Sequence, residues 1–119
     1  MNTKITKEDV EMAQYIIYIL KSKRIITMSW GFNSPTIITD GLQFNVQGFI
    51  HTGLVQVIYV HGVDLFKIRL LLNENELLKE IEQVYFDELV EIIDNYVEKV
   101  NNYNGRVKSE YPNLNLHSN

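Results

Sequence analysis

Residues 42–72 constrain the fold more than any other stretch of the sequence, because apolar and polar side chains alternate along much of it. Two connections that each contain a glycine, at residues 51–53 and 61–63, divide the stretch into three runs. A period of two predicts β-strands, and short connections between the runs predict antiparallel neighbours. We therefore expect a three-stranded meander at the centre of the chain.

The chain before the meander is expected to begin with a helix. Thr6 followed by Asp9 resembles a capping box, and apolar residues recur at helical spacing from there to about Lys23. Residues 25–32 then alternate apolar with small or polar side chains, which predicts a strand, and residues 36–39 predict a shorter one. The complete sheet would thus have four or five strands.

A second, longer helix is expected after the meander. Asn73 with Glu76 is typical of a helix start, and no glycine or proline follows before Gly105. The helix would cover residues 73–103, with an apolar arc of about 180°. Such a wide arc has more surface to bury than one sheet face offers, which indicates contact with the first helix or with a second subunit.

These elements define an α+β protein in the order α-β(4–5)-α, with both helices packed on one face of an antiparallel sheet. A length of 119 residues suffices for one domain with its own core, and a hydrophobic fraction of 45% agrees with a globular chain. We expect residues 1–103 to form that domain and residues 104–119 to form a polar C-terminal tail.

Several classes of site and location are excluded by composition. The chain has no cysteine, and its three histidines lack the spacing of metal ligands. We therefore expect no metal and no cofactor. The longest apolar run near the N-terminus, residues 15–20, is too short for export or for a membrane span. A cytoplasmic protein that does not contact membranes is expected.

The charge of the chain is acidic and concentrated in the second predicted helix. A net charge of −4 with no basic cluster argues against nucleic acid as a partner. Residues 73–103 contain two Lys or Arg against nine Asp or Glu. Five of the acids would form a stripe on one side of the helix, which is typical of a solvated face. An alternative function is an inhibitor that imitates phosphates to occupy a basic nucleic-acid-binding site, using Glu80, Asp87, Glu91, Asp94 and Glu98.

One end of the predicted sheet should bring a histidine between two carboxylates, because the turns that contain Asp40, His61 and Asp64 should meet there. A carboxylate orients an imidazole and raises its basicity, so such a group can act as a general base. Asp and Gly are also the residues that tight turns require. A small enzyme or ligand-binding domain is therefore a further alternative, although we assign no catalytic residue.

The leading hypothesis is a non-catalytic protein-interaction or regulatory protein that forms a homodimer or binds another protein. The second face of the predicted meander carries too many aliphatic residues for a wholly solvated surface. Aromatic residues should gather at one end of the sheet and favour contact with a partner. The expected partner-binding residues are Trp30, Phe49, His51, Gln56, Ile58, Lys67 and Arg69.

Overall fold

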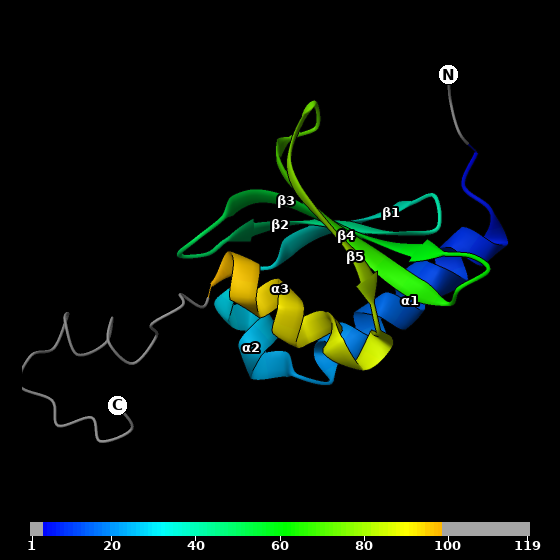
Figure 1. Ribbon diagram of the computed structural model, residues 1–119, viewed down its shortest axis with the longest axis horizontal. Coiled ribbons are helices and arrows are strands. Elements are labelled where there is room, and N and C mark those ends of the chain that lie inside the picture. The colour runs from blue at the N-terminus through cyan, green and yellow to red at the C-terminus, as the bar shows by residue number, and fades with distance from the viewer. Residues whose placement is uncertain (1–3, 99–119) are drawn as a thin grey trace, which may run out of the picture.

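The structure, a computed structural model, describes residues 4–98 of the chain. Two helices precede a five-stranded sheet, and a short 3₁₀ turn and a third helix follow it (Figure 1). The elements in chain order are α1 (Lys7–Lys21), α2 (Arg24–Ser29), β1 (Asn33–Ile38), β2 (Gly41–Gln47), β3 (Thr52–Val60), β4 (Leu65–Asn73), β5 (Glu76–Val84), η1 (Phe86–Glu88) and α3 (Leu89–Val97).

The α+β class, the antiparallel meander and the α-β5-α order are confirmed. The strands pair in sequence order, β1-β2-β3-β4-β5, and every neighbouring pair is antiparallel. All three described helices lie on one side of this sheet, as Figure 1 shows. We call the sheet face under the helices the inner face and the opposite face the outer face.

The hydrophobic core fills the space between the inner face and the helices. Each strand from β2 to β4 contributes alternate residues, while α1 and α3 contribute residues at helical spacing. The largest fully buried side chains are Trp30, Phe44, Ile16, Leu20, Leu42, Ile68, Leu89 and Ile93, with Val46, Val55, Val57 and Val84.

Helix α1 begins as its sequence predicts. The Thr6 side chain accepts a hydrogen bond from the Asp9 amide, and the Asp9 carboxylate accepts one from the Thr6 amide. This reciprocal pair satisfies two amide groups that a helix start leaves without partners. The expected helix is confirmed and ends at Lys21.

The strand expected at residues 25–32 is wrong, because most of this segment forms helix α2. Apolar residues two apart are also four apart when the pattern repeats, so Ile26 and Trp30 fit helical spacing as well as strand spacing. The helix is held against α1 by Thr27, whose hydroxyl donates a 2.7 Å hydrogen bond to the Leu20 carbonyl. The first strand starts only at Asn33.

The long helix expected over residues 73–103 is also wrong in its extent. Residues 76–84 form strand β5, which pairs with β4 through three irregularities in register. Helix α3 is nine residues long and begins at Leu89. The expected end of the long helix, residues 99–103, and the expected tail, residues 104–119, lie outside the described residues.

The loop between β2 and β3 closes the C-terminal end of α3. The amides of Ile50 and His51 donate hydrogen bonds of 2.8 and 3.2 Å to the Val97 carbonyl. The last carbonyls of a helix have no partner within it, so the loop supplies one. Gly48 lies so close to this helix end that a Cβ atom at its position would be 2.2 Å from the Val97 carbonyl oxygen.

Substitution of Gly48 by alanine should therefore destabilise the fold. A Gly→Ala change where the backbone is unstrained ordinarily stabilises a protein by about 0.4–1 kcal/mol. Here the clash with the Val97 carbonyl should reverse the sign and cost roughly 1–3 kcal/mol, as overpacking does. Urea denaturation of the two proteins measures the difference, and an alanine variant as stable as the parent would contradict the close approach.

Candidate interaction surfaces

The outer face of the sheet is crossed by a row of polar side chains, one from each strand. Thr36 pairs with Gln43, Gln43 with Gln56, Gln56 with Arg69, and Arg69 with Glu80. Residues that face each other across neighbouring strands project to the same side of a sheet, so the five side chains form one continuous line. We call these five residues the polar row.

Hydrogen bonds and an ion pair connect four members of the polar row, from Gln43 to Glu80. The Gln56 side chain donates from Nε2 to Gln43 Oε1 at 2.9 Å, and Arg69 Nη1 lies 3.5 Å from Gln56 Oε1. Arg69 Nε is 3.3 Å from Glu80 Oε1, which is close enough for an ion pair. Its N–H is not aligned for a hydrogen bond to that oxygen, and it has no other hydrogen-bond partner among the described residues although solvent does not reach it. The guanidinium therefore retains unused donor capacity.

A second row, of leucines, lies beside the polar row on the same face. Leu54 pairs with Leu71, and Leu71 pairs with Leu77. Leu54 and Leu71 are only 8% and 5% exposed, although no described helix covers them. Neither belongs to the core cluster between the inner face and the helices. On the far side of the polar row, Ile58 pairs with Lys67. The outer face thus alternates apolar and charged groups.

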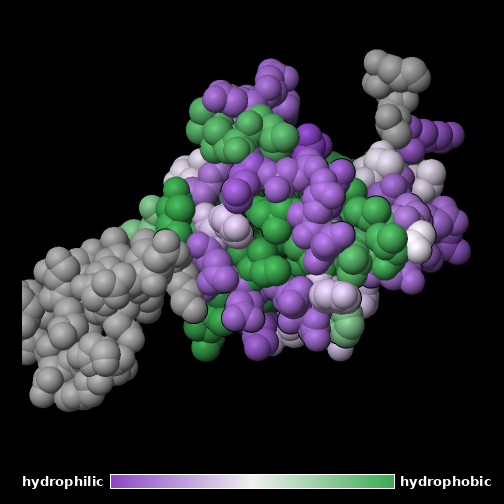
Figure 2. Space-filling model, viewed as in Figure 1, coloured by the Kyte–Doolittle hydropathy of each residue, from purple (hydrophilic) through white to green (hydrophobic). Residues whose placement is uncertain are grey.

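The β4–β5 hairpin adds further apolar surface. In Figure 2 hydrophobic residues gather on this hairpin below a hydrophilic tip. Leu72, Leu77 and Leu78 are each about half exposed, at 50%, 44% and 52%. Leucines exposed together are more informative than leucines exposed singly, and a group of this kind favours contact with a protein.

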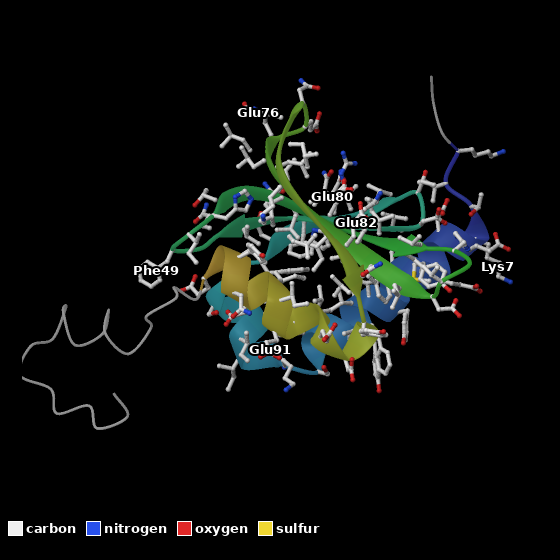
Figure 3. All side chains as sticks on the ribbon, viewed as in Figure 1. Lys7, Phe49, Glu76, Glu80, Glu82 and Glu91 are labelled. Atoms are coloured by element: carbon white, nitrogen blue, oxygen red, sulfur yellow. The ribbon has the colours of Figure 1, made fainter. Side chains whose placement is uncertain are left out.

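The expected partner-binding residues are divided by the structure. Gln56, Ile58, Lys67 and Arg69 lie on the outer face as expected, with intermediate exposure. Phe49 is 60% exposed on the loop between β2 and β3, where Figure 3 shows it pointing outward.

The other two expected partner-binding residues are unavailable to a partner. Trp30 is fully buried in the core, where it stacks on Phe44 and donates a 2.9 Å hydrogen bond from Nε1 to Asp94. His51, the last residue of the loop between β2 and β3, is buried, with Nε2 3.1 Å from the Leu54 carbonyl oxygen. Their expected role as partner contacts is wrong, because both side chains complete the packing of this chain.

The expected acidic stripe does not exist as a single line on a helix. Glu80 belongs to strand β5 and Asp87 to the 3₁₀ turn, while only Glu91 and Asp94 lie within α3. Figure 3 shows Glu80 and Glu91 on opposite sides of the sheet. The alternative of a phosphate-imitating helix depended on one continuous stripe, so it loses its structural basis.

Two of those acids bind within the chain instead. Asp94 accepts the hydrogen bond of Trp30, and Glu98 accepts one of 3.2 Å from the Phe49 amide. Both carboxylates therefore hold structural elements together, which reduces their availability to a basic partner.

The turns at the other end of the sheet come together as expected, with one difference. His61 Nε2 lies 2.9 Å from Asp40 Oδ1, so these two residues form a pair. Asp64 instead accepts a hydrogen bond from the Tyr59 hydroxyl, which raises the pKa of Tyr59. The His61 side chain is 70% exposed and that of Asp40 38%. An imidazole so open to water lacks the enclosure that tunes a catalytic base.

Asp9 joins this end of the sheet to the first helix. Besides capping α1, its carboxylate accepts a 2.8 Å hydrogen bond from the Asp40 amide in the turn between β1 and β2. That bond, followed by the one from the Thr6 amide, lowers the pKa of Asp9 because both favour the charged carboxylate. Asp9 is therefore a structural link, which the sequence revealed only as a helix cap.

Comparison of the chain with protein-family models, with curated proteins and with solved structures finds no match in any of the three. Among the described helices, none combines the length and apolarity needed to cross a bilayer. Within residues 4–98, no three His, Asp or Glu side chains converge as metal ligands would. The surfaces of the molecule are therefore the source of any inference about its function.

The link through Asp9 predicts a dependence of stability on pH. The folded state lowers the pKa of Asp9, so its contribution to stability is present above the ordinary carboxyl value, about 3.9, and is lost as pH falls through the lower folded value. The Asp9→Asn variant should be less stable than the parent at pH 7, and the gap should narrow below about pH 4. Urea midpoints measured across this range test the idea, and a gap independent of pH would contradict it.

Proposed function

We propose that this protein is a non-catalytic interaction or regulatory protein that forms a homodimer through the outer face of its sheet. The observation that carries the proposal is the outer face itself. It combines the polar row with the half-exposed leucines of the β4–β5 hairpin, and no described helix covers it (Figure 1). A sheet with apolar residues on both faces is best stabilised when both faces are covered.

Charges on the outer face make it complementary to a copy of itself. Lys67 and Arg69 supply positive charge on β4, while Glu80 supplies negative charge on the neighbouring β5. A two-fold axis brings the same patch of both subunits together, so residue i of one subunit meets residue j of its partner and the reverse. Arg69 of each subunit can thereby face Glu80 of the other.

The size of the outer face suits a stable interface. Three of the strands have nine residues, which corresponds to about 30 Å at ~3.3 Å per residue. Five strands about 4.8 Å apart span roughly 20 Å, so the face measures on the order of 600 Å². A stable interface of standard size buries about 800 Å² per partner. The sheet face alone approaches this value, and the half-exposed leucines of the hairpin extend it.

Charge-reversal variants mixed with each other test this proposal. Arg69→Glu places two acids in the polar row, and Glu80→Arg places two bases there. Each variant alone should dimerise at least about ten-fold more weakly than the parent, because like charges then face each other across the axis. An equal mixture should restore the dimer as a heterodimer, since each acid then meets a base. Sedimentation velocity and native mass spectrometry measure both effects.

Charge changes elsewhere on the surface provide the control for this experiment. Lys7→Glu and Glu11→Arg alter exposed residues of helix α1 by the same charges, so they should leave association unchanged. Circular dichroism should show that all four variants are folded. A parent chain that sediments as a monomer at every concentration, or a mixture that shows no preference for the heterodimer, would contradict the proposal.

A further inference from the structure

A groove lies between the helices, on the side of the molecule away from the sheet. Its volume is about 690 Å³, within the range of roughly 300–1,000 Å³ that ligand-binding clefts show. Helices α1 and α2 form one wall, and η1 with the start of α3 forms the other. The groove is separate from the outer sheet face, because the helical layer and the sheet lie between the two surfaces (Figure 1).

Exposed aromatic side chains line the groove. Tyr15 and Tyr18 come from successive turns of α1, and Phe86 faces them from the 3₁₀ turn. Tyr18 is 73% exposed and Phe86 56%. Tyr15 and Tyr18 cannot join the core, because the opposite side of α1 already packs on the sheet through Ala13 and Ile16. The chain therefore maintains an apolar surface here that it does not bury itself.

One rim of the groove is acidic. Asp87, Glu91 and Asp94 follow one another along the wall formed by η1 and α3, and Glu91 projects from the helical layer in Figure 3. Lys23 is the one cationic residue of the groove lining, on the opposite wall. The structure shows no ion pair to Asp87 or Glu91 from any described residue. The groove thus combines exposed aromatic side chains with a surplus of negative charge.

We propose that this groove binds a short amphipathic helix of another protein, with aliphatic residues on one side and Lys or Arg beside them. The aliphatic side would cover Tyr18 and Phe86, as helices do when they dock into apolar grooves. The basic residues would face Asp87 and Glu91 and would set the orientation of the helix. The proposal does not depend on the outer sheet face, because it uses different residues on the opposite side.

The acidic rim and the exposed aromatic side chains distinguish a basic amphipathic helix from other occupants of the groove. The acidic rim repels nucleic-acid phosphates and the anionic headgroups of a membrane. A small molecule would leave much of the exposed aromatic surface in contact with water, whereas a helix would cover it along its length. A second copy of this chain and its own residues 99–119 are the remaining occupants, and the experiment below separates them from a partner helix.

The test uses a defined probe, a fluorescein-labelled peptide of 18 residues with leucines at helical spacing on one side and lysines on the other. Two control peptides accompany it, one with the same composition in an order that is not amphipathic and one with glutamate in place of lysine. Fluorescence anisotropy with the full chain should show binding of the amphipathic basic peptide that is at least about ten-fold tighter than that of either control.

Variants of the protein assign the binding to the groove. Tyr18→Ser and Phe86→Ser remove exposed aromatic surface and should each weaken binding of the basic peptide about ten-fold. Glu91→Lys should weaken it by a similar factor, with a smaller dependence on salt. Controls outside the groove, Val63→Ser and Glu82→Lys, remove an exposed apolar side chain and reverse an exposed acid, and they should leave binding unchanged.

Four results would overturn the proposal. Equal binding of the three peptides would mean that no amphipathic helix is recognised. Loss of binding in the controls outside the groove to the same degree would place the site elsewhere. Dissociation of an oligomer by Tyr18→Ser would identify a second copy as the occupant. Tighter peptide binding in the full chain carrying Arg106→Glu and Lys108→Glu would identify residues 99–119 as the occupant.

Discussion

The buried indole of Trp30, at the end of α2, connects α2 with the sheet and with α3, and the arrangement of the other elements depends on it. Its ring stacks on Phe44 of the sheet with centroids 6.4 Å apart, and its Nε1 donates to Asp94 of α3. Its carbonyl accepts a 2.6 Å hydrogen bond from the Gln47 amide at the end of β2. An indole N–H needs an acceptor when it is buried, and its loss leaves a penalty of about 1–3 kcal/mol. Trp30 therefore fixes α2 and α3 together over the inner face, so the helices leave the outer face open.

The meander was predictable from the sequence because its polar and apolar residues alternate without conflict. The strand at residues 76–84 was not predictable. Glu, Leu, Lys and Gln favour helices, and the apolar residues of this segment recur at helical spacing. Pairing with β4 overrides that preference, and an extra residue at Leu78 and at Gln83 keeps the strand in register. Gln83 adopts a φ of 61°, which a local pattern does not reveal.

The candidate surfaces were predictable only as far as strand register was. Gln56, Lys67 and Arg69 were assigned to one face because the meander fixes their phase. Glu80 completes the polar row only because β5 is a strand, and a helix over residues 76–84 would have left it out of the row. Trp30 was also misplaced, because the strand expected at residues 25–32 would have brought it to the end of the sheet.

The two surfaces differ in chemistry in a way that fits different partners. The outer sheet face carries both signs of charge among leucines, which suits a copy of itself, whereas the helical groove carries aromatic residues and negative charge, which suits a basic helix. A dimer formed through the outer sheet face would leave the helical groove of each subunit exposed, on opposite sides of the dimer. The protein could then hold two copies of a partner at a fixed separation.

Cross-linking through single cysteines tests the sheet-to-sheet dimer most directly, because the chain has no cysteine of its own. Two sheets that pack face to face lie about 10 Å apart. Ile58 lies on the outer face, beside the proposed contacts of Arg69 with Glu80, so a cysteine introduced as Ile58→Cys should be joined to its copy by a bismaleimide with a long flexible spacer at micromolar protein concentration. A cysteine introduced as Tyr18→Cys, on the opposite side, should remain uncoupled. Cross-linking at position 18 but not at position 58 would contradict a dimer formed through the outer face.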